Sequence, residues 1–425
     1  MHISSAGRRA LALGATVASL AAAPAAAQQA PGGARVLTVG DTLVGAVGGV
    51  AVDGIGTIYV ADFAETVYKI RPDGRASVFA TGLYGASGNA IDPQGNLYQS
   101  SFAGNYVTKI DRQGRQEIVA EGLQGPVGVA IADGELFVCN CRANTIARVS
   151  AAGEVTTFAE SPLFNCPNGI TRAPSGDLYV VNFSDGRMLE VTPDGGVSEL
   201  ATLPGGGNGH VTFARGSLYA TSFMGHRVYR VSLDGEVTLI AGTGARGETD
   251  GPALEATFSW PNGIAASPQG DRLYINDYIN RTPPTMPIPP VPKSTLRVVR
   301  LVSLSDRMAA AFESGGVDAM AEAYHAWKSD PATAGVFTEV EVNQYGYRLM
   351  GGGQLDAALR VFELNAESYP TSWNVWDSLA EAHLRSGNDA KAIELYEKSL
   401  ELNPANTNAT QMLERLRGGS RAMRG

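Results

Sequence analysis

Residues 88–101 read Gly88-Asn89-Ala90-Ile91-Asp92-Pro93-Gln94-Gly95-Asn96-Leu97-Tyr98-Gln99-Ser100-Ser101, and this stretch decides the fold. A glycine opens a short strand, a glycine-containing turn follows, and a second strand runs from Leu97 to Ser101. The opening glycine recurs as Gly49, Gly88, Gly128, Gly169, Gly209 and Gly263. Each unit of about 40 residues contains short strands and tight turns, the pattern of a four-stranded β-propeller blade. Six units predict six radially stacked blades, because one sheet cannot bury both of its faces alone.

The sixth unit lacks a fourth strand, and the N-terminal region supplies one. After the strand Leu296 to Leu301 the pattern turns helical, whereas residues 35–40 (Arg-Val-Leu-Thr-Val-Gly) match the fourth strands of the other units. We therefore expect residues 35–40 to close blade six. Residues 34–302 are then one all-β six-bladed propeller.

An aromatic residue recurs just after the second strand of most units. The series is Phe63, Phe102, Phe183, Phe223 and Tyr278, with Cys141 at this place in the third unit. We interpret the series as core packing between blades rather than as a platform for a ligand.

The first 27 residues have the features of a secretory signal. Arg8 and Arg9 precede the apolar stretch Ala10 to Ala22, and Ala25-Ala26-Ala27 provides a cleavage site. The mature protein is therefore expected to be periplasmic or secreted, and no second apolar run of spanning length follows. The formal charge of −9 argues against a nucleic-acid binder, which would carry a basic face.

From Ser305 the glycine turns stop and a helical pattern begins, so residues 305–425 are predicted to form a small all-α domain. Two units of tetratricopeptide type are indicated, at 339–370 and 371–404, with helices at about 306–329 and 405–417 capping the two ends. The second unit has Trp376, Leu379, Ala380, His383, Ala392, Tyr396 and Ser399, and ends at Pro404. Such repeats imply a protein or peptide partner.

The repeat resembles the Asn-His-Leu (NHL) propellers. The stretch from Gly247-Glu248-Thr249-Asp250-Gly251-Pro252 to Pro261-Asn262-Gly263-Ile264-Ala265 is similar to the long inter-blade loop of bacterial NHL proteins. Pro261 to Gly270 with Leu273-Tyr274 also resembles the senescence-marker (regucalcin), gluconolactonase and strictosidine-synthase-like propellers. The resemblance covers about 270 residues and strongly implies the fold. It says little about the chemistry, because propellers have many different functions.

The residue before each repeat glycine begins the innermost strand and is expected to face the central channel. Around the ring these residues are Gly48, Ser87, Val127, Asn168, Asn208 and Asn262. In the regucalcin and gluconolactonase family such positions ligate a divalent cation, so Asn168, Asn208 and Asn262 are the candidate ligands for a polar molecule or Ca²⁺. The alternative is that Asn in Asn-Gly suits the turn that enters the blade. No carboxylate occupies these positions, although calcium sites normally include one.

Three other polar residues are candidate accessory groups. Asp62 and Asp277 end second strands and could reach inward. His210 is the third, although the propeller has only His210 and His226, which are too few for a three-histidine zinc site; we interpret both as solvated or capping.

The three cysteines of an exported chain suggest one disulfide. Cys141 ends the second strand of blade three and Cys166 precedes the first strand of blade four, so this pair is the predicted bridge. Cys139 is the alternative partner.

Two enlarged loops are expected at the end of the ring where the asparagines lie. One contains Asp250-Gly251-Pro252, and the other is the Pro-rich stretch from Pro283 to Pro292. Enlarged loops at one end of a scaffold often carry function, whereas the alternative for the Pro-rich stretch is an inert linker.

Two functions follow from the sequence. The first is an exported binding and interaction module, which takes a small polar ligand on the propeller and a protein or peptide on the tail. The alternative is a metal-dependent, lactonase-like hydrolase that uses the asparagine ring, so the sequence leaves open whether the protein is an enzyme.

Overall fold

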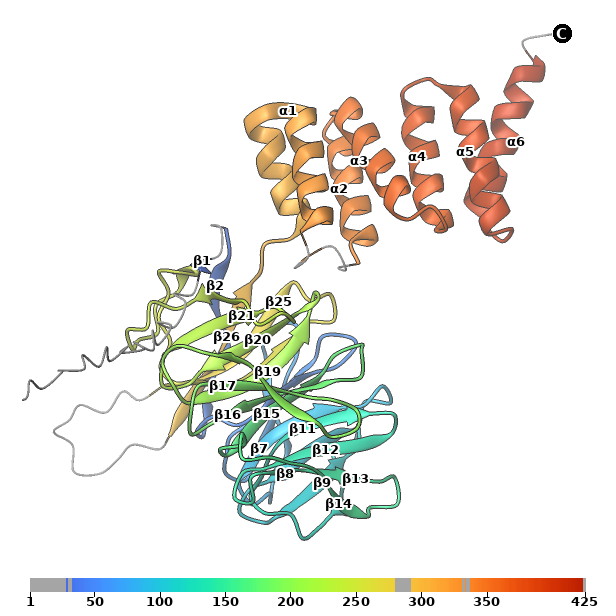
Figure 1. The fold of residues 1–425 in the computed structure, drawn as a ribbon. Helices are drawn as coiled ribbons and strands as arrows, with labels where there is room; N and C mark the ends of the chain where they lie inside the picture. Colours follow the sequence, from blue (N-terminus) through green and yellow to red (C-terminus); the bar gives the residue numbers. More distant parts are fainter. Residues whose placement is uncertain (1–27, 30–32, 280–291, 331–332, 334–336, 423–425) are drawn as a thin grey trace, which may run out of the picture.

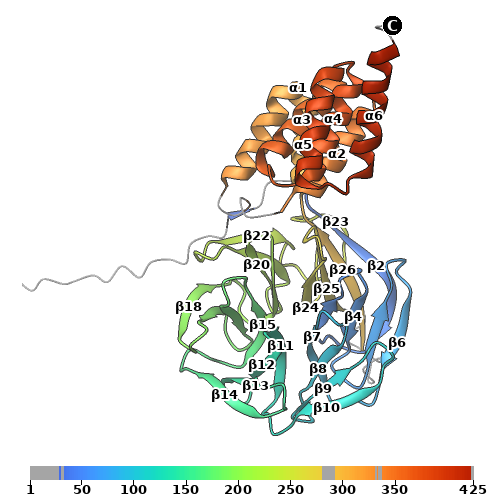
Figure 2. The same cartoon turned by 90° about the vertical axis from the view of Figure 1, so that its right-hand side faces the viewer.

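The computed structural model describes residues 28–29, 33–279, 292–330, 333 and 337–422. Six sheets are arranged radially as the blades of a propeller, and a helical tail follows them (Figures 1 and 2). The predicted fold, an all-β six-bladed propeller followed by an all-α region, is confirmed.

Each blade is a four-stranded antiparallel meander, with its first strand near the central axis. Blade one has β3 (Val50–Val52), β4 (Ile58–Ala61), β5 (Val67–Ile70) and β6 (Ala76–Ala80). Blade two has β7 (Ala86–Ile91), β8 (Leu97–Ser101), β9 (Tyr106–Ile110) and β10 (Gln116–Ala120). Blade three has β11 (Pro126–Ala132), β12 (Glu135–Asn140), β13 (Thr145–Val149) and β14 (Val155–Glu160).

The next two blades repeat this order. Blade four has β15 (Pro167–Arg172), β16 (Leu178–Asn182), β17 (Arg187–Val191) and β18 (Val197–Thr202). Blade five has β19 (Asn208–Ala214), β20 (Ser217–Ser222), β21 (Arg227–Val231) and β22 (Val237–Ala241), and β1 (Gln28–Gln29) pairs in parallel with β22. Second strands such as β16 are buried throughout, because neighbouring blades cover both of their faces.

Blade six is built from both ends of the propeller segment. It contains β24 (Pro261–Ala266), β25 (Arg272–Ile279), β26 (Lys293–Arg300), β2 (Arg35–Val44) and β23 (Gly251–Pro252). The fourth strand, β2, pairs antiparallel with β26, and Arg35 lies opposite Arg300. Val36 of β2 is fully buried against blade five and blade six residues. Residues far apart in the sequence therefore close the ring.

The repeat glycines set the distance between blades near the axis. A Cβ atom on Gly88, Gly128 or Gly263 would lie closer than 3.0 Å to a backbone carbonyl oxygen of the next blade. The first strands can approach this closely only without side chains at these positions. The repeat glycine is therefore a packing requirement of the ring.

The tail consists of helices that pack in sequence order (Figure 1). They are α1 (Leu304–Ser329), α2 (Glu339–Gly351), α3 (Leu355–Ser368), α4 (Trp373–Arg385), α5 (Asp389–Leu402) and α6 (Thr407–Ala422). α2 with α3 and α4 with α5 form helical hairpins. At Gly346 a Cβ atom would lie 2.6 Å from Phe362 Cε1, so glycine allows α2 and α3 to pack closely.

α1 folds back on itself at Gly316, where the backbone leaves helical geometry (φ 73°, ψ −157°). The guanidinium carbon of Arg307 lies 4.9 Å from the centre of the Trp327 ring. A straight helix would separate these residues by about 30 Å. The segment before α2 is therefore a further hairpin, which covers the end of the repeat stack.

Only residues 301–303 separate β26 from α1. Ser303 caps α1 by accepting a hydrogen bond from the Asp306 backbone N–H, and the Asp306 carboxylate accepts one from the Ser303 N–H. Arg215 of blade five donates from Nη1 to the Val302 carbonyl (3.0 Å). The connection is thus short and tied to the propeller.

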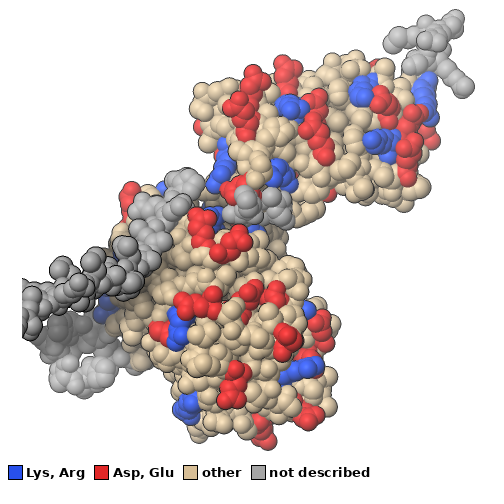
Figure 3. All heavy atoms as spheres, viewed as in Figure 1, with Lys and Arg blue, Asp and Glu red and all other residues tan. Residues whose placement is uncertain are grey.

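Acidic and basic side chains are scattered over the face shown in Figure 3, and no basic cluster is visible there. Within the described part of the chain, no helix is long and apolar enough to cross a membrane.

Candidate functional site

A cavity of about 580 Å³ lies around the axis at one end of the ring. Its lining residues precede or begin first strands, or lie at the ends of second strands and just beyond them. We call this cavity the bowl. It is lined by Ala46, Val47, Phe63, Ser87, Phe102, Val127, Cys141, Cys166, Asn168, Phe183, Phe223, Met224, Trp260, Asn262 and Tyr278. Its volume is within the range of small-molecule sites.

The recurring aromatic residues form the wall of the bowl. Ring centres are 5.7 Å apart for Phe63 and Phe102, and 5.6 Å apart for Phe183 and Phe223. Phe63 keeps 42% of its surface exposed. The rings therefore pack between neighbouring blades as predicted, but they line an opening and are not core: a position repeated in successive blades places one ring per blade around it.

Trp260 completes the aromatic wall and was not foreseen from the sequence. Its ring centre lies 6.4 Å from that of Phe223 and 5.6 Å from that of Tyr278. Its backbone N–H donates to His226 Nδ1 (3.2 Å). The rings of Phe223, Trp260 and Tyr278 thus form one continuous side of the bowl.

Two lining residues have a backbone conformation that normally requires glycine. The position two residues before the inner-strand asparagine has φ of 52° at Cys166 and 64° at Trp260. Blades two, three and five have glycine there, namely Gly85, Gly125 and Gly206, also with positive φ. A side chain in this conformation costs roughly 1–2 kcal/mol. The sequence signal for Trp260 and Cys166 is a large side chain at a position of the repeat where three other blades have glycine.

A disulfide joins Cys141 to Cys166, with 3.9 Å between their Cα atoms. Cys141 stands in blade three where the other blades have an aromatic residue, so the bridge fills the gap in the aromatic wall. It also ties blade three to blade four. Cys139 is a buried free thiol, and burial raises the pKa of this group.

The inner-strand asparagines connect neighbouring blades. Asn168 Nδ2 donates to the carbonyls of Asn208 (3.1 Å) and Gly209 (2.7 Å), and Asn262 Nδ2 donates to the Val47 carbonyl (2.8 Å). Asn262 is 8% exposed, and its buried Oδ1 has no hydrogen-bond partner among the described residues. Asn168 and Asn262 therefore have a structural role through their amide nitrogens.

Asn208 does not join the other two asparagines at the bowl. It is fully buried, lies outside the lining, and donates from Nδ2 to the Arg187 carbonyl (3.3 Å). The expectation that three carboxamides face one ligand must therefore be corrected to two.

The bowl does not fit the calcium ion that the family resemblance implied. Calcium takes about six to eight oxygen ligands, usually with carboxylates among them. The polar side chains of the lining are Ser87, Asn168, Asn262 and Tyr278, and no Asp, Glu or His belongs to it. The described residues also contain no group of three or more His, Cys, Asp or Glu that could hold a metal ion. The lining suits a largely apolar ligand with few polar groups.

Two of the candidate accessory residues, Asp62 and His210, lie outside the lining of the bowl. Asp62 Oδ1 accepts hydrogen bonds from the backbone N–H groups of Ala64 (2.8 Å) and Thr66 (2.9 Å) and so fixes a turn. His210 is 7% exposed, and burial lowers its pKa to about 4. The interpretation of His210 as solvated or capping is wrong, because it is a buried neutral side chain.

Asp277 belongs to a buried ionic cluster in blade six. It accepts hydrogen bonds from the Ser259 backbone N–H (2.8 Å) and from Arg297 Nη1 (3.3 Å), and all three side chains are buried. Burial raises the pKa of Asp277 to about 7, while the Arg297 charge acts in the opposite direction. Arg297 Nη2 also donates to Asp250 Oδ1 (2.9 Å), so the cluster holds the long loop before blade six.

The Asp250 loop does not cover the bowl as expected. Asp250 accepts hydrogen bonds from the Thr38 backbone N–H (2.8 Å) and hydroxyl (3.0 Å), and β23 pairs with β2. Residues 250–252 therefore extend the outer edge of blade six. Most of the Pro-rich stretch, residues 283–291, lies outside the described residues.

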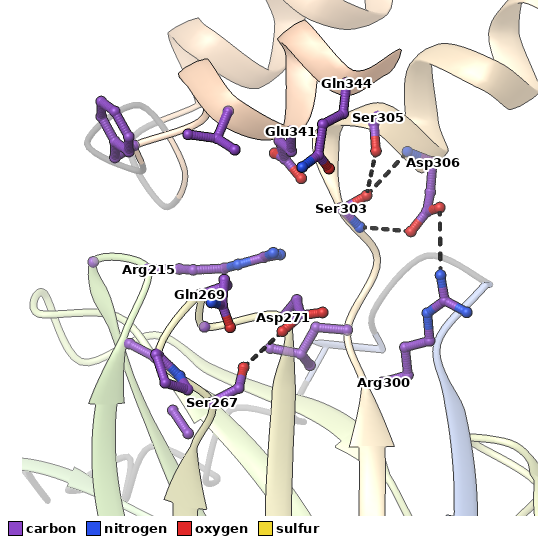
Figure 4. A pocket seen from close by; sticks show the side chains of 18 of the residues that line it. Arg215, Ser267, Gln269, Asp271, Arg300, Ser303, Ser305, Asp306, Glu341 and Gln344 are labelled. Atoms are coloured by element: carbon purple, nitrogen blue, oxygen red, sulfur yellow. Dashed lines mark hydrogen bonds and ion pairs between the residues drawn. The ribbon is translucent and has the colours of Figure 1, made fainter. Parts of the chain in front are cut away.

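A second cavity, of about 1150 Å³, lies where the propeller meets the tail (Figure 4). The turns after the first strands of blades five and six line it, together with residues of α2. Arg215 and Asp271 lie on the propeller side and Glu341 and Gln344 on the tail side. Burial raises the pKa of Glu341, and the charge of Arg215 opposes that shift. Because first strands begin at the bowl and end here, the tail joins the opposite end of the ring.

Residues 373–406 match the tetratricopeptide repeat family, which confirms the repeat type of the tail. An auxiliary nutrient binding protein from Bacteroides ovatus is 14% identical (TM-score 0.52), with 63% of this chain and 77% of that chain covered. A protein of unknown function from Bacteroides thetaiotaomicron is 16% identical (TM-score 0.52), with 63% and 76% covered. A gluconolactonase from Xanthomonas campestris is 19% identical (TM-score 0.48), with 63% and 90% covered.

The two likenesses with a TM-score of 0.52 show the fold alone, because both are below 20% identity. No curated protein matches the sequence significantly. The chain is a six-bladed β-propeller followed by a helical tail with a tetratricopeptide repeat.

Proposed function

We propose that this is an exported binding protein whose propeller takes up a small ligand with an apolar body in the bowl. The observation that carries this proposal is the pair Trp260 and Cys166. Both hold side chains in the bowl lining at a position where three other blades have glycine. Strained backbone that is kept despite its cost is concentrated at functional sites.

The chemistry of the lining supports an apolar ligand. Rings from blades one, two, four, five and six surround the opening, and the disulfide completes the wall in blade three. Aromatic surfaces release water on contact with apolar or aromatic groups and fix their orientation.

Export is part of the same proposal. Residues 1–27 have the pattern of a secretory signal, and a disulfide between Cys141 and Cys166 suits an oxidising compartment such as the periplasm.

Binding in the bowl can be tested with N-phenyl-1-naphthylamine, a neutral aromatic dye whose emission rises in apolar surroundings. The wild-type protein should bind one dye molecule, and Trp260→Gly should weaken binding at least tenfold. Ile55→Ala is the matched control, because Ile55 is 85% exposed and follows the first strand of blade one, at the other end of the ring. Equal binding by Trp260→Gly and the wild type, with both proteins folded, would contradict the proposal.

The alternative function, lactone hydrolysis, needs a general base or a metal-bound water in the bowl. The lining residues supply neither an acid nor a histidine. Hydrolysis of a simple lactone by purified protein, lost in Trp260→Gly, would favour this alternative over a binding role.

For the tail we propose a protein or peptide partner. Tetratricopeptide hairpins stack into a continuous surface that suits extended partners. Chemical crosslinking of the full chain in the cell that exports it should join residues of the helices α2, α3, α4 and α5 to a single partner protein. Cross-links confined to the blades would contradict this assignment.

A further inference from the structure

We infer that the bowl selects an amphipathic anion, with an apolar or aromatic body in the bowl and an anionic group at its rim held by Arg142 and Arg246. This inference rests on the proposed binding function and names the class of ligand. The lining itself contains no charged side chain. The charges that lie directly on its aromatic wall are these two guanidinium groups.

Arg142 lies over the Phe102 side of the bowl. Its guanidinium carbon is 4.5 Å from the centre of the Phe102 ring, and its side chain is exposed. A Cβ atom on Gly125 would lie 2.8 Å from Arg142 Cγ. Glycine at the left-handed position of blade three therefore leaves the space in which the Arg142 stem lies against the wall.

Arg246 is the counterpart on the blade six side. Its guanidinium carbon lies 3.8 Å from the centre of the Trp260 ring, and its Nε donates to Ser259 Oγ (3.0 Å). The stacking and the hydrogen bond orient the guanidinium plane, while the terminal nitrogens remain free to donate to an anion. Each of the two arginines thus holds its charge against a different ring of the aromatic wall.

Neither guanidinium has an ion-pair partner among the carboxylates of the described residues, whose recorded ion pairs involve other arginines. The acidic side chains of the neighbouring turns are already engaged: Asp62 accepts two backbone hydrogen bonds, and Asp185 pairs with Arg187 (2.7 Å). A cationic ligand would be repelled by the two guanidinium groups. A carboxylate, sulfonate or phosphate would gain charge-assisted hydrogen bonds.

The test uses two dyes that differ mainly in one charge: 8-anilinonaphthalene-1-sulfonate and neutral N-phenyl-1-naphthylamine. The double variant Arg142→Gln/Arg246→Gln should weaken binding of the sulfonate about tenfold or more and leave the neutral dye within about twofold. Added salt should weaken only sulfonate binding. Arg75→Gln, an exposed arginine beside Asp73, is the matched control.

The outcomes separate this inference from the proposed function. If Trp260→Gly weakens both dyes but the arginine variant leaves sulfonate binding unchanged, the bowl binds ligands and the anion selectivity is wrong. If Trp260→Gly affects neither dye while circular dichroism shows a folded protein, the proposed function itself fails. Loss of sulfonate affinity alone in the arginine variant supports both.

Discussion

Trp260 and Cys166 occupy equivalent positions in blades six and four, each two residues before a Pro-Asn-Gly inner strand asparagine, and both have left-handed backbone. The first brings an indole to the bowl, and the second brings one half of a disulfide. An indole ring and a disulfide thus reach the same cavity from equivalent positions with left-handed backbone.

This geometry makes a prediction about stability at Trp260. Trp260→Ala and Trp260→Gly both remove the indole, but only glycine relieves the strain of φ 64°. We expect Trp260→Gly to be more stable than Trp260→Ala by about 1 kcal/mol. Urea unfolding of the two variants measures the difference, and equal midpoints would mean that this site carries no strain.

The disulfide should stabilise the propeller. The Cys141–Cys166 bridge spans 25 residues, and loop-closure entropy alone predicts about 3 kcal/mol for such a loop. Cys141→Ser should lower the free energy of unfolding by this order, whereas Cys139→Ala tests the buried free thiol of β12, two residues away. Peptide mapping without reductant should recover Cys141 linked to Cys166, and three free thiols would contradict the bridge.

The repeat glycines offer a matched pair of substitutions. Gly128→Ala forces a Cβ atom against the Asn168 carbonyl of the next blade, whereas Gly54→Ala meets no atom within 4 Å. Overpacking of this kind costs about 1–3 kcal/mol. Gly128→Ala should therefore lower the melting temperature by several degrees, and Gly54→Ala should not; similar melting temperatures for both variants would argue against close inter-blade packing.

His210 makes stability depend on pH. Its pKa falls from 6.5 in the unfolded chain to about 4 in the folded protein, because burial penalises the charged form. Between pH 6.5 and 4 the unfolded state binds more protons at this residue, so the contribution of His210 to stability falls as the pH falls through this window, by about 3 kcal/mol. His210→Gln should lose this part of the pH dependence, as urea unfolding at pH 7 and pH 4.5 would show. If the pH dependence of the free energy of unfolding is unchanged in the variant, a group other than His210 causes it.

The fold could be predicted because the ring imposes one requirement on every blade. The glycine that begins each inner strand recurs as Gly49, Gly88 and their equivalents, since any side chain there would collide with the next blade. The same repeat showed that the last unit lacks its fourth strand and that residues 35–40 match that strand, so the closure of the ring could be predicted as well.

The bowl could be predicted only in part, because a repeat pattern does not say which end of a blade is covered. Phe63 and its equivalents have the spacing of core residues, and only the three-dimensional ring shows that they surround an opening. The inner asparagines have the right spacing for a shared site, yet Asn208, where the register of β19 shifts, donates its amide to the Arg187 carbonyl of blade four and does not line the bowl. Side-chain direction at such irregular points depends on tertiary packing rather than on sequence period.

The pairing of Arg35 with Arg300 has a mechanical consequence. The chain enters blade six through β2 and leaves it through β26 at the same end of one antiparallel ladder. A pulling force applied between the N-terminal segment and the tail would act across that ladder and separate it one residue pair at a time, beginning at Arg35 and Arg300. Traction between residue 34 and the tail would therefore open the ring at its seam, where β2 pairs with β26.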